Sequence, residues 1–245
     1  PEEDVEKLEA GYALPRAQFD SLLFNRCQAL VRGAGGLVIQ GGEVRSVLFD
    51  DGAGGQDPGE GAGDARHASG VVVRIGGRNG EERTFYPREL VGAGGYRCPV
   101  ARSVVESSYN EVMMDRDHYC GGYREYWRNV KGCEANAGDI EIHFVDSVIP
   151  GYFWLFPVSE NVVNVGIGMV MGLLDKQKKK LKALQADVIA NHPMFKDRFA
   201  DAEMVPGSAK GWQLPFGSPR KKSSLQPRRS SMNGVRLVGD AASLI

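Results

Sequence analysis

The sequence contains no apolar stretch long enough to cross a bilayer. Its longest run of apolar residues and glycine, residues 165–174, has about half the ~20 residues that a membrane-spanning helix needs. The formal net charge is −1, so no excess of positive charge favours a nucleic-acid partner. No charged segment, apolar segment and cleavage site open the chain, so secretion is not expected. These absences favour a cytoplasmic location.

Cysteine is also scarce. The four cysteines show no C-x-x-C spacing and no paired histidines accompany them, so we expect neither a zinc site nor a disulfide framework. Glycine, in contrast, is abundant at 32 residues. Such a glycine content favours many turns and many places where the backbone can be approached closely.

The first part of the chain mixes helix with short strands. Apolar side chains at helical spacing predict a helix over residues 16–31 with one buried stripe. Asn79-Gly80 predicts the turn of a hairpin, and the polar, glycine-rich residues 50–68 predict a mobile loop. Strands are predicted at residues 37–39, 44–49, 71–75, 84–86 and 89–91, and a short helix at residues 99–105.

Longer strands follow in the second part. Alternating residues predict strands at 123–130, 140–145, 153–158 and 162–170. One helix is predicted over residues 173–191, ending before Pro193 because the residue before a proline disfavours helical geometry. A buried strand at residues 235–238 then leads into Gly239-Asp240 and the expected start of another helix.

The composition changes near Glu106 and near Pro227, which predicts two interleaved domains. Residues 1–105 and 228–245 are expected to form a nucleotide-binding sheet, and residues 106–227 an inserted antiparallel sheet. The fold class is therefore α/β (α+β). The chain begins at Pro1 in an acidic run and ends where a helix is expected to begin, so we interpret it as the middle of a longer protein, truncated at both ends.

The strongest local signal lies at the C-terminal Gly239-Asp240-Ala241. An apolar strand ends in a glycine, which lets a ligand approach the backbone, and an aspartate, which can accept hydrogen bonds from sugar-alcohol hydroxyls. The N–H groups of a following helix start suit a pyrophosphate. The same residues also fit a capping aspartate at the start of an ordinary helix.

A second signal is the aromatic strand around Tyr152, Trp154, Phe156 and Pro157. A strand with glycines at Gly166 and Gly168 follows it, and glycines opposite aromatic rings favour a shallow groove for a long apolar ligand. Core aromatics whose crowding the glycines relieve are the alternative interpretation.

Together these residues resemble the geranylgeranyl reductase family, within the larger p-hydroxybenzoate hydroxylase-like superfamily of FAD enzymes. The resemblance extends over the whole chain. The family's aromatic signature and its later glycine–x–glycine are matched by Tyr152, Trp154, Phe156, Pro157, Gly166 and Gly168. Its arginine–x–x–aromatic–aspartate helix start is matched by Arg16, Phe19 and Asp20, and its flavin-binding glycine–aspartate motif by Gly239 and Asp240.

The resemblance implies a Rossmann-like FAD-binding domain interleaved with a substrate domain. It places Arg16, Gly239, Asp240 and Ala241 near the cofactor, with Asp240 on the ribitol chain of FAD. The aromatic motif and its glycines would line a cavity for an isoprenoid lipid. The implied reaction is hydride transfer from reduced flavin to a C=C bond, so the chemistry is flavin-based and no residue is assigned a catalytic role.

This sequence departs from the family at Gly92-Ala93-Gly94-Gly95, where the family has an aspartate at the third position. The electron donor, reduced nicotinamide or ferredoxin, therefore stays open. The dinucleotide fingerprint G-x-G-x-x-G is absent from the chain, and we expect this chain alone not to hold FAD tightly. Two alternatives remain: an FAD-dependent monooxygenase or halogenase acting on an aromatic or carrier-bound substrate, and a lipid-binding relative without catalysis.

Positive charge is unevenly distributed in the last third of the chain. Residues 204–239 contain several lysines and arginines and no acidic residue, and residues 176–182 add more lysines. Anionic lipid headgroups attract such segments, so we expect peripheral contact with a membrane surface. A solvated surface is the alternative interpretation.

Overall fold

The computed structural model describes residues 15–50, 67–108, 112–134, 139–217 and 229–245. These residues divide into two compact units. The first combines parts of residues 1–38, 123–168 and 180–211, and the second combines parts of residues 39–122, 169–179 and 212–245. The domain boundaries expected near residues 106 and 227 stay a prediction.

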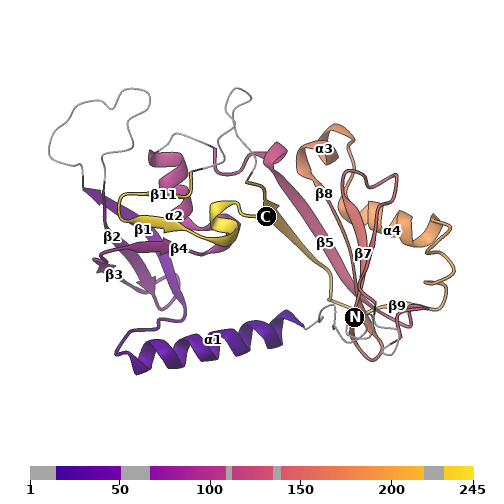
Figure 1. Ribbon diagram of the computed structural model, residues 1–245, viewed down its shortest axis with the longest axis horizontal. Helices are drawn as coiled ribbons and strands as arrows, with labels where there is room; N and C mark the ends of the chain where they lie inside the picture. The colour runs from indigo at the N-terminus through magenta and orange to yellow at the C-terminus, as the bar shows by residue number, and fades with distance from the viewer. Residues whose placement is uncertain (1–14, 51–66, 109–111, 135–138, 218–228) are drawn as a thin grey trace, which may run out of the picture. The chain divides into compact units, whose positions relative to one another are not determined.

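The second unit contains a three-stranded antiparallel sheet (Figure 1). Its order is β1 (Gly42–Asp50), β2 (His67–Ile75) and β3 (Glu81–Phe85). The predicted hairpin is confirmed, with Ile75 opposite Glu81. The strand predicted at residues 37–39 is wrong, because these residues are irregular and Gly41, at φ 71°, turns the chain immediately before β1. The loop predicted at residues 50–68 lies almost entirely outside the described residues.

A smaller sheet joins two distant parts of the chain. Strand β12 (Val235–Leu237) pairs parallel with β4 (Leu90–Gly92), and β11 (Ser231–Met232) pairs antiparallel with β12. The predicted helix at residues 99–105 appears as α2 (Pro99–Arg102), followed by a π-helical turn, Ser103–Ser108. The core against this sheet includes Val100, Ala101, Val104, Val105, Val235 and Leu237.

The antiparallel sheet predicted for the second part of the chain is confirmed (Figure 1). Its order is β10-β5-β8-β7-β6, with β9 paired to β5. The predicted strand at residues 140–145 shortens to three residues. The strands are β5 (Tyr119–Arg128), β6 (Glu141–His143), β7 (Tyr152–Ser159), β8 (Val162–Val170), β9 (Glu203–Met204) and β10 (Lys210–Pro215).

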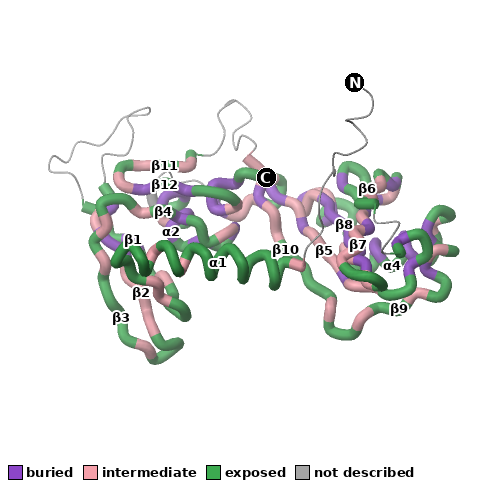
Figure 2. The backbone as a smooth tube through the Cα atoms, turned by 60° about the horizontal axis from the view of Figure 1, so that its bottom comes forward, coloured by how far each residue is buried: buried purple, intermediate pink, exposed green. Residues whose placement is uncertain are grey.

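One face of this sheet forms the core of the first unit. Phe153 and Leu155 of β7 pair with Ile167 and Val165 of β8, and all four side chains are fully buried. Helix α4 (Leu181–Asn191) contributes Leu184, Gln185, Val188 and Ile189 to the buried set, and Phe195 follows it. Figure 2 shows buried residues (purple) in β7, β8 and α4. We call this the covered face.

The helix predicted over residues 173–191 is two helices. Helix α3 (Met171–Lys176) ends where Lys178 adopts φ 51°, and α4 begins at Leu181. The Lys179 N–H donates to the Leu174 carbonyl and the Lys178 N–H to the Asp175 carbonyl, the pattern of a Schellman cap. Such a cap usually has glycine at the left-handed position, so a lysine there gave no sequence signal. Helix α4 ends at Asn191, before Pro193, as predicted.

Helix α1 (Arg16–Gly33) confirms the predicted helix but not its buried stripe. None of its residues is buried, and Leu22 and Leu23 are 66% and 56% exposed (Figure 2). Helical spacing shows which side of a helix is apolar, whereas burial depends on what packs against that side. Within the described ranges, no helix is long and apolar enough to cross a membrane.

An ionic network on the covered face connects two side chains of β6 with Arg198. Arg198 donates to both carboxylate oxygens of Glu141, at 2.6 and 2.7 Å, and His143 Nε2 lies 2.7 Å from the same carboxylate. Burial by itself raises the pKa of Glu141, but the hydrogen bonds from Arg198 and His143 outweigh it and leave that pKa lowered. The ionised carboxylate therefore stabilises the fold.

We predict that Glu141→Gln lowers the free energy of unfolding by about 2 kcal/mol at neutral pH, because hydrogen bonds to a largely buried charge are lost. The contribution is present above the ordinary carboxyl pKa of 4.5 and disappears as the pH falls through the lowered folded pKa. Urea unfolding at about pH 7 and about pH 3 measures it. The exposed Glu160→Gln serves as control. A Glu141→Gln deficit that is as large at about pH 3 as at about pH 7 would contradict the prediction.

Candidate functional site

The opposite face of the β6–β7–β8 sheet carries a row of aromatic side chains. Tyr152 and Phe156 flank Trp154 on β7, and alternation places all three away from the covered face. The ring centroids of Tyr152 and Trp154 lie 5.8 Å apart, and those of Trp154 and Phe156 lie 6.1 Å apart with 29° between their planes. Tyr152 is 41% exposed, and the other two rings are half-buried. We call this the aromatic face.

Strand β8 presents two glycines to the aromatic face. Gly168 lies opposite Tyr152 and Gly166 lies opposite Trp154. A Cβ on Gly166 would overlap the indole ring, so the ring lies directly on the glycine backbone. The space that Gly166 leaves is thus filled by Trp154 itself. The predicted role of these residues in binding a lipid stays a prediction.

Strand β6 extends the aromatic face with side chains that the sequence motifs did not include. Ile142 lies opposite Trp154 on the other side of β7 and is 51% exposed. Phe144, just beyond β6, is 75% exposed and its ring contacts Tyr152 at 6.5 Å between centroids. The apolar surface therefore spans three strands. Exposed apolar side chains that gather on one face indicate a binding surface.

Pro157 belongs to the aromatic sequence motif but not to the aromatic face. It lies opposite Val163, whose side chain is buried on the covered face. Strand alternation therefore points Pro157 away from Trp154. The sequence motif groups Pro157 with the aromatic residues, whereas in the pleated strand its side chain lies on the opposite face from their rings.

A second candidate site lies in the other unit, where β4 and β12 end. Because these strands are parallel, the turn after Gly92 and the turn at Gly239 leave the sheet at the same edge, and the Val238 N–H donates to the Gly92 carbonyl at 3.1 Å. Ligands of α/β folds bind at such carboxyl edges. The structure thus brings the Gly92–Gly95 and Gly239–Asp240 segments together.

Only part of the predicted Gly239-Asp240-Ala241 site is accessible. Gly239 has φ 57° and open space where a Cβ would lie, and Asp240 is half-buried, whereas Ala241 is fully buried in the core. The predicted helix start is wrong: Gly239–Ala242 is a 3-10 turn that Ser243 ends in a left-handed conformation. The expected α-helix is therefore replaced by a single short turn.

Gly94 stands where the resembling family has an aspartate. A Cβ at residue 94 would lie 3.2 Å from Cys98 Sγ, so the buried Cys98 occupies the adjacent space. Burial raises the pKa of another thiol, Cys120, which makes it a neutral thiol rather than a reactive thiolate. Neither cysteine has the features of a catalytic nucleophile.

Arg16, predicted near the cofactor, begins α1. Its guanidinium pairs with Asp20 at 2.8 Å, and its side chain is 82% exposed. This ion pair links two of the three residues of the predicted helix-start motif at i and i+4 spacing. The predicted contact of Arg16 with a cofactor is not tested by this pairing.

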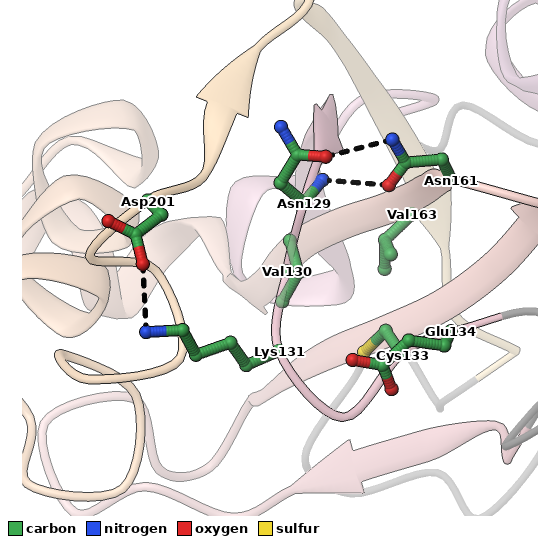
Figure 3. A pocket seen from close by; sticks show the side chains of 8 residues that line it. All are labelled: Asn129, Val130, Lys131, Cys133, Glu134, Asn161, Val163 and Asp201. Carbon is green, nitrogen blue, oxygen red and sulfur yellow. Dashed lines mark hydrogen bonds and ion pairs between the residues drawn. The ribbon is translucent and has the colours of Figure 1, made fainter.

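A cavity of about 290 Å³ lies at the end of β5, with Asn129, Lys131 and Asn161 in its lining (Figure 3). Asn129 and Asn161 hydrogen-bond to each other across it, and Lys131 pairs with Asp201 at 2.9 Å. These contacts pair four of the lining residues with one another. The aromatic face, where large apolar side chains are exposed, is the better candidate for binding.

Residues 118–205 match the family model of the geranylgeranyl reductase catalytic domain. This range contains the aromatic face, the covered face and α4. Over these residues the chain is similar to the geranylgeranyl reductase family. The family resemblance read from Trp154 and its neighbours is thereby confirmed.

Two curated relatives illustrate the similarity. The digeranylgeranylglycerophospholipid reductase of Thermoplasma acidophilum is 26% identical over 97% of this chain and 50% of its own length. That of Methanosarcina acetivorans is also 26% identical, over 66% of this chain and 35% of its own length. The chain thus spans half or less of the length of these relatives.

Solved structures share the fold. A geranylgeranyl bacteriochlorophyll reductase-like protein from Thermoplasma acidophilum has a TM-score of 0.64 at 21% identity, covering 94% of this chain and 48% of that protein. The myxobacterial chondrochloren halogenase, an FAD-dependent enzyme, has a TM-score of 0.63 at 26% identity, covering 94% and 46%. The fold of this chain is thus one that an FAD-dependent enzyme also uses.

We predict that Gly166→Ala displaces the Trp154 indole, because the added methyl group would occupy the position of the ring. Overpacking of this kind costs about 1–3 kcal/mol. Urea unfolding and tryptophan emission of the variant measure the two effects. Gly122→Ala, at a β5 glycine with open space beside it, is the matched control. Unchanged emission together with unchanged stability in Gly166→Ala would contradict the described packing.

Proposed function

We propose that the intact protein reduces C=C bonds of an isoprenoid lipid and uses FAD as its redox cofactor. The observation that carries the proposal is the aromatic face, which lies within the residues that match the reductase catalytic domain. Relatives whose printed name is digeranylgeranylglycerophospholipid reductase support the substrate class. The electron donor, reduced nicotinamide or ferredoxin, is left open.

The aromatic face suits an isoprenoid chain for a physical reason. Such a chain offers no hydrogen-bonding group, so its binding energy comes from apolar area removed from water, about 25 cal/mol per Å². Tyr152, Trp154 and Phe156 on β7 and Ile142 beside them on β6 supply a continuous apolar surface across neighbouring strands. The protein would hold the alkene in one orientation and exclude water from it.

The turn at Gly239-Asp240 suits part of FAD. Open space beside Gly239 allows a ligand to approach the backbone, and the half-buried Asp240 carboxylate can accept hydrogen bonds from the hydroxyls of a ribitol chain. When bound and reduced, FAD supplies the hydride that an alkene reduction requires. Gly239 and Asp240 would hold the cofactor and take no part in the chemistry.

A second candidate function is an FAD-dependent halogenase or monooxygenase. The likeness to the chondrochloren halogenase, at 26% identity, favours it. These reactions consume oxygen whereas alkene reduction does not, so oxygen uptake on adding a reductant separates the two. A lipid-binding relative without catalysis, the third possibility, would lack bound flavin.

Two substitutions in the intact protein test the proposal. Trp154→Ala should raise the KM for a geranylgeranyl lipid at unchanged flavin content, because the apolar surface is lost while the Gly239-Asp240 turn is untouched. Asp240→Ala should lower flavin occupancy, because the acceptor for the cofactor hydroxyls is lost. Anaerobic reduction of the lipid and flavin absorbance are the two measurements.

The two variants control for each other. A Trp154→Ala protein that loses flavin and cooperative unfolding together would identify Trp154 as a core residue, since deletion of a buried tryptophan costs about 3–5 kcal/mol. Wild-type flavin absorbance in Asp240→Ala would count against the cofactor assignment. Oxygen-dependent turnover without alkene reduction would favour the halogenase or monooxygenase.

We also propose that the protein is cytoplasmic and contacts the membrane surface peripherally, since its lipid substrate resides there. The basic residues near the C-terminus support this, although Arg236 is paired with Glu89 at 3.0 Å and Lys176 lies 3.9 Å from Asp117. Other basic residues of this segment, at 218–228, lie outside the described residues. Each well-placed basic residue is expected to contribute about 1 kcal/mol to the attraction between the protein and an anionic membrane surface.

Co-sedimentation with vesicles tests the membrane contact. The intact protein should sediment with anionic vesicles at low salt and be released at high salt, because salt screens the attraction. Neutral vesicles are the control. Recovery in the supernatant under every condition would contradict the proposal.

A further inference from the structure

Trp154 has only one polar side chain beside it on β8. The β8 residues opposite Phe156, Trp154 and Tyr152 are Asn164, Gly166 and Gly168. Two of the three have no side chain. Asn164 is therefore the single β8 side chain near Trp154 on this face that can direct the indole. It was not among the site residues predicted from the sequence.

The contact between the two side chains is specific. The indole Nε1–H donates to the Asn164 Oδ1 at 3.1 Å. Because an indole N–H can only donate, the asparagine must present its oxygen and not its amide nitrogen. Both side chains are half-buried, so water competes less with this bond than it would at an exposed site.

The bond determines where the ring lies. The indole is confined between the Gly166 backbone beneath it and the Asn164 acceptor at its N–H end. In this orientation the indole plane lies 29° from the Phe156 plane, with 6.1 Å between the ring centroids, so the two rings form adjoining parts of the aromatic face. A tryptophan without an acceptor at residue 164 could rotate about its side-chain torsions and tilt out of that surface.

We propose that Asn164 is a positioning residue for the lipid site. It holds the Trp154 indole flat on Gly166 and thereby maintains the apolar surface on which the isoprenoid chain lies. The residue acts through Trp154 and needs no contact with the lipid itself. This inference rests on the proposed function, because it assigns Asn164 a role in that same site.

A double-mutant cycle in the intact protein tests the proposal. Asn164→Leu removes the acceptor at similar volume, and Trp154→Phe removes the donor while retaining an aromatic ring. Loss of one hydrogen bond corresponds to roughly a 3–10-fold rise in KM for a geranylgeranyl lipid. We expect this rise for Asn164→Leu in the wild-type background, with kcat within about twofold. In the Trp154→Phe background the same change should alter KM less than about twofold.

Two further variants act as controls. Asn164→Asp retains the acceptor oxygen and should restore KM to within about threefold of the wild-type value. Asn161→Leu removes an asparagine of the same hairpin that bonds to Asn129 and does not contact Trp154. It should leave KM unchanged even if it lowers stability. An equal rise in KM for Asn161→Leu would reduce Asn164 to a structural role and overturn the proposal.

The position of the ring can be measured without substrate. The Trp154 contribution to near-UV circular dichroism is the difference between each protein and its Trp154→Phe counterpart. We expect Asn164→Leu to diminish this contribution and Asn164→Asp to retain it. An unchanged Trp154 signal in Asn164→Leu overturns the proposal, as does a KM increase that is equally large in the Trp154→Phe background.

The same measurements distinguish a failure of the role proposed for Asn164 from a failure of the proposed reductase function. If the intact wild-type protein reduces no prenyl alkene, the proposed function fails and the assigned role in lipid binding fails with it. In that case a diminished Trp154 signal in Asn164→Leu would still support the hydrogen bond as the device that orients the ring. An undiminished signal would overturn that part as well.

Discussion

The register between β7 and β8 is the constraint on which the first unit depends. Trp154 lies opposite Gly166, and Leu155 lies opposite Val165, so one strand pair sorts its residues into an aromatic face and a covered face. A slip of one residue would move every side chain to the other face of the sheet. The indole could not then rest on a glycine, and the core leucine would be exposed. The packing of Trp154 on Gly166 is possible in this register and not in a register shifted by one residue in either direction.

The two faces of the sheet distribute polarity in an unusual way. The covered face contains buried polar groups: the Glu125 carboxylate accepts hydrogen bonds from Tyr123, Trp127 and Gln185, at 2.6, 3.1 and 3.0 Å. Burial, followed by the bond to Glu125, raises the pKa of Tyr123 to about 12. The aromatic face, in contrast, exposes large apolar side chains. Buried polar groups and exposed apolar groups are the informative departures from the usual pattern, and the exposed apolar groups indicate a binding surface.

The second candidate site, at Gly239-Asp240, depends on a different constraint: the last strand of the chain pairs with a strand from its first part. Strand β12 follows all strands of the six-stranded sheet in the sequence, yet it pairs with β4, which precedes them. This pairing brings Gly239-Asp240 beside the turn that follows Gly92. The close packing there explains the glycine, since a Cβ on Gly92 would lie 2.7 Å from Leu237 Cδ2. Apolar packing of α2 under the two strands stabilises the edge from which both turns leave.

The sequence by itself predicted most of the strands and helices and the resemblance to the reductase family. Alternation over residues 153–158 and 162–170 predicted β7 and β8, and the aromatic and glycine motifs identified the reductase family that the comparison of residues 118–205 confirms. These features are local, because strand alternation and motif spacing are properties of adjacent residues. The helix cap at Lys178 was missed for the converse reason: its left-handed residue is not the glycine that such a cap usually has.

Only the tertiary structure decided which residues share a face. The structure places Pro157 on the other face from the rings beside it in the sequence. It adds Ile142 and Asn164 from neighbouring strands to the aromatic face, and it shows that the indole fills the space over Gly166. It also left the apolar stripe of α1 uncovered. Side-chain contacts across strands depend on register, and burial depends on which distant segment packs against a surface. Neither quantity is encoded in the spacing of residues along a single element.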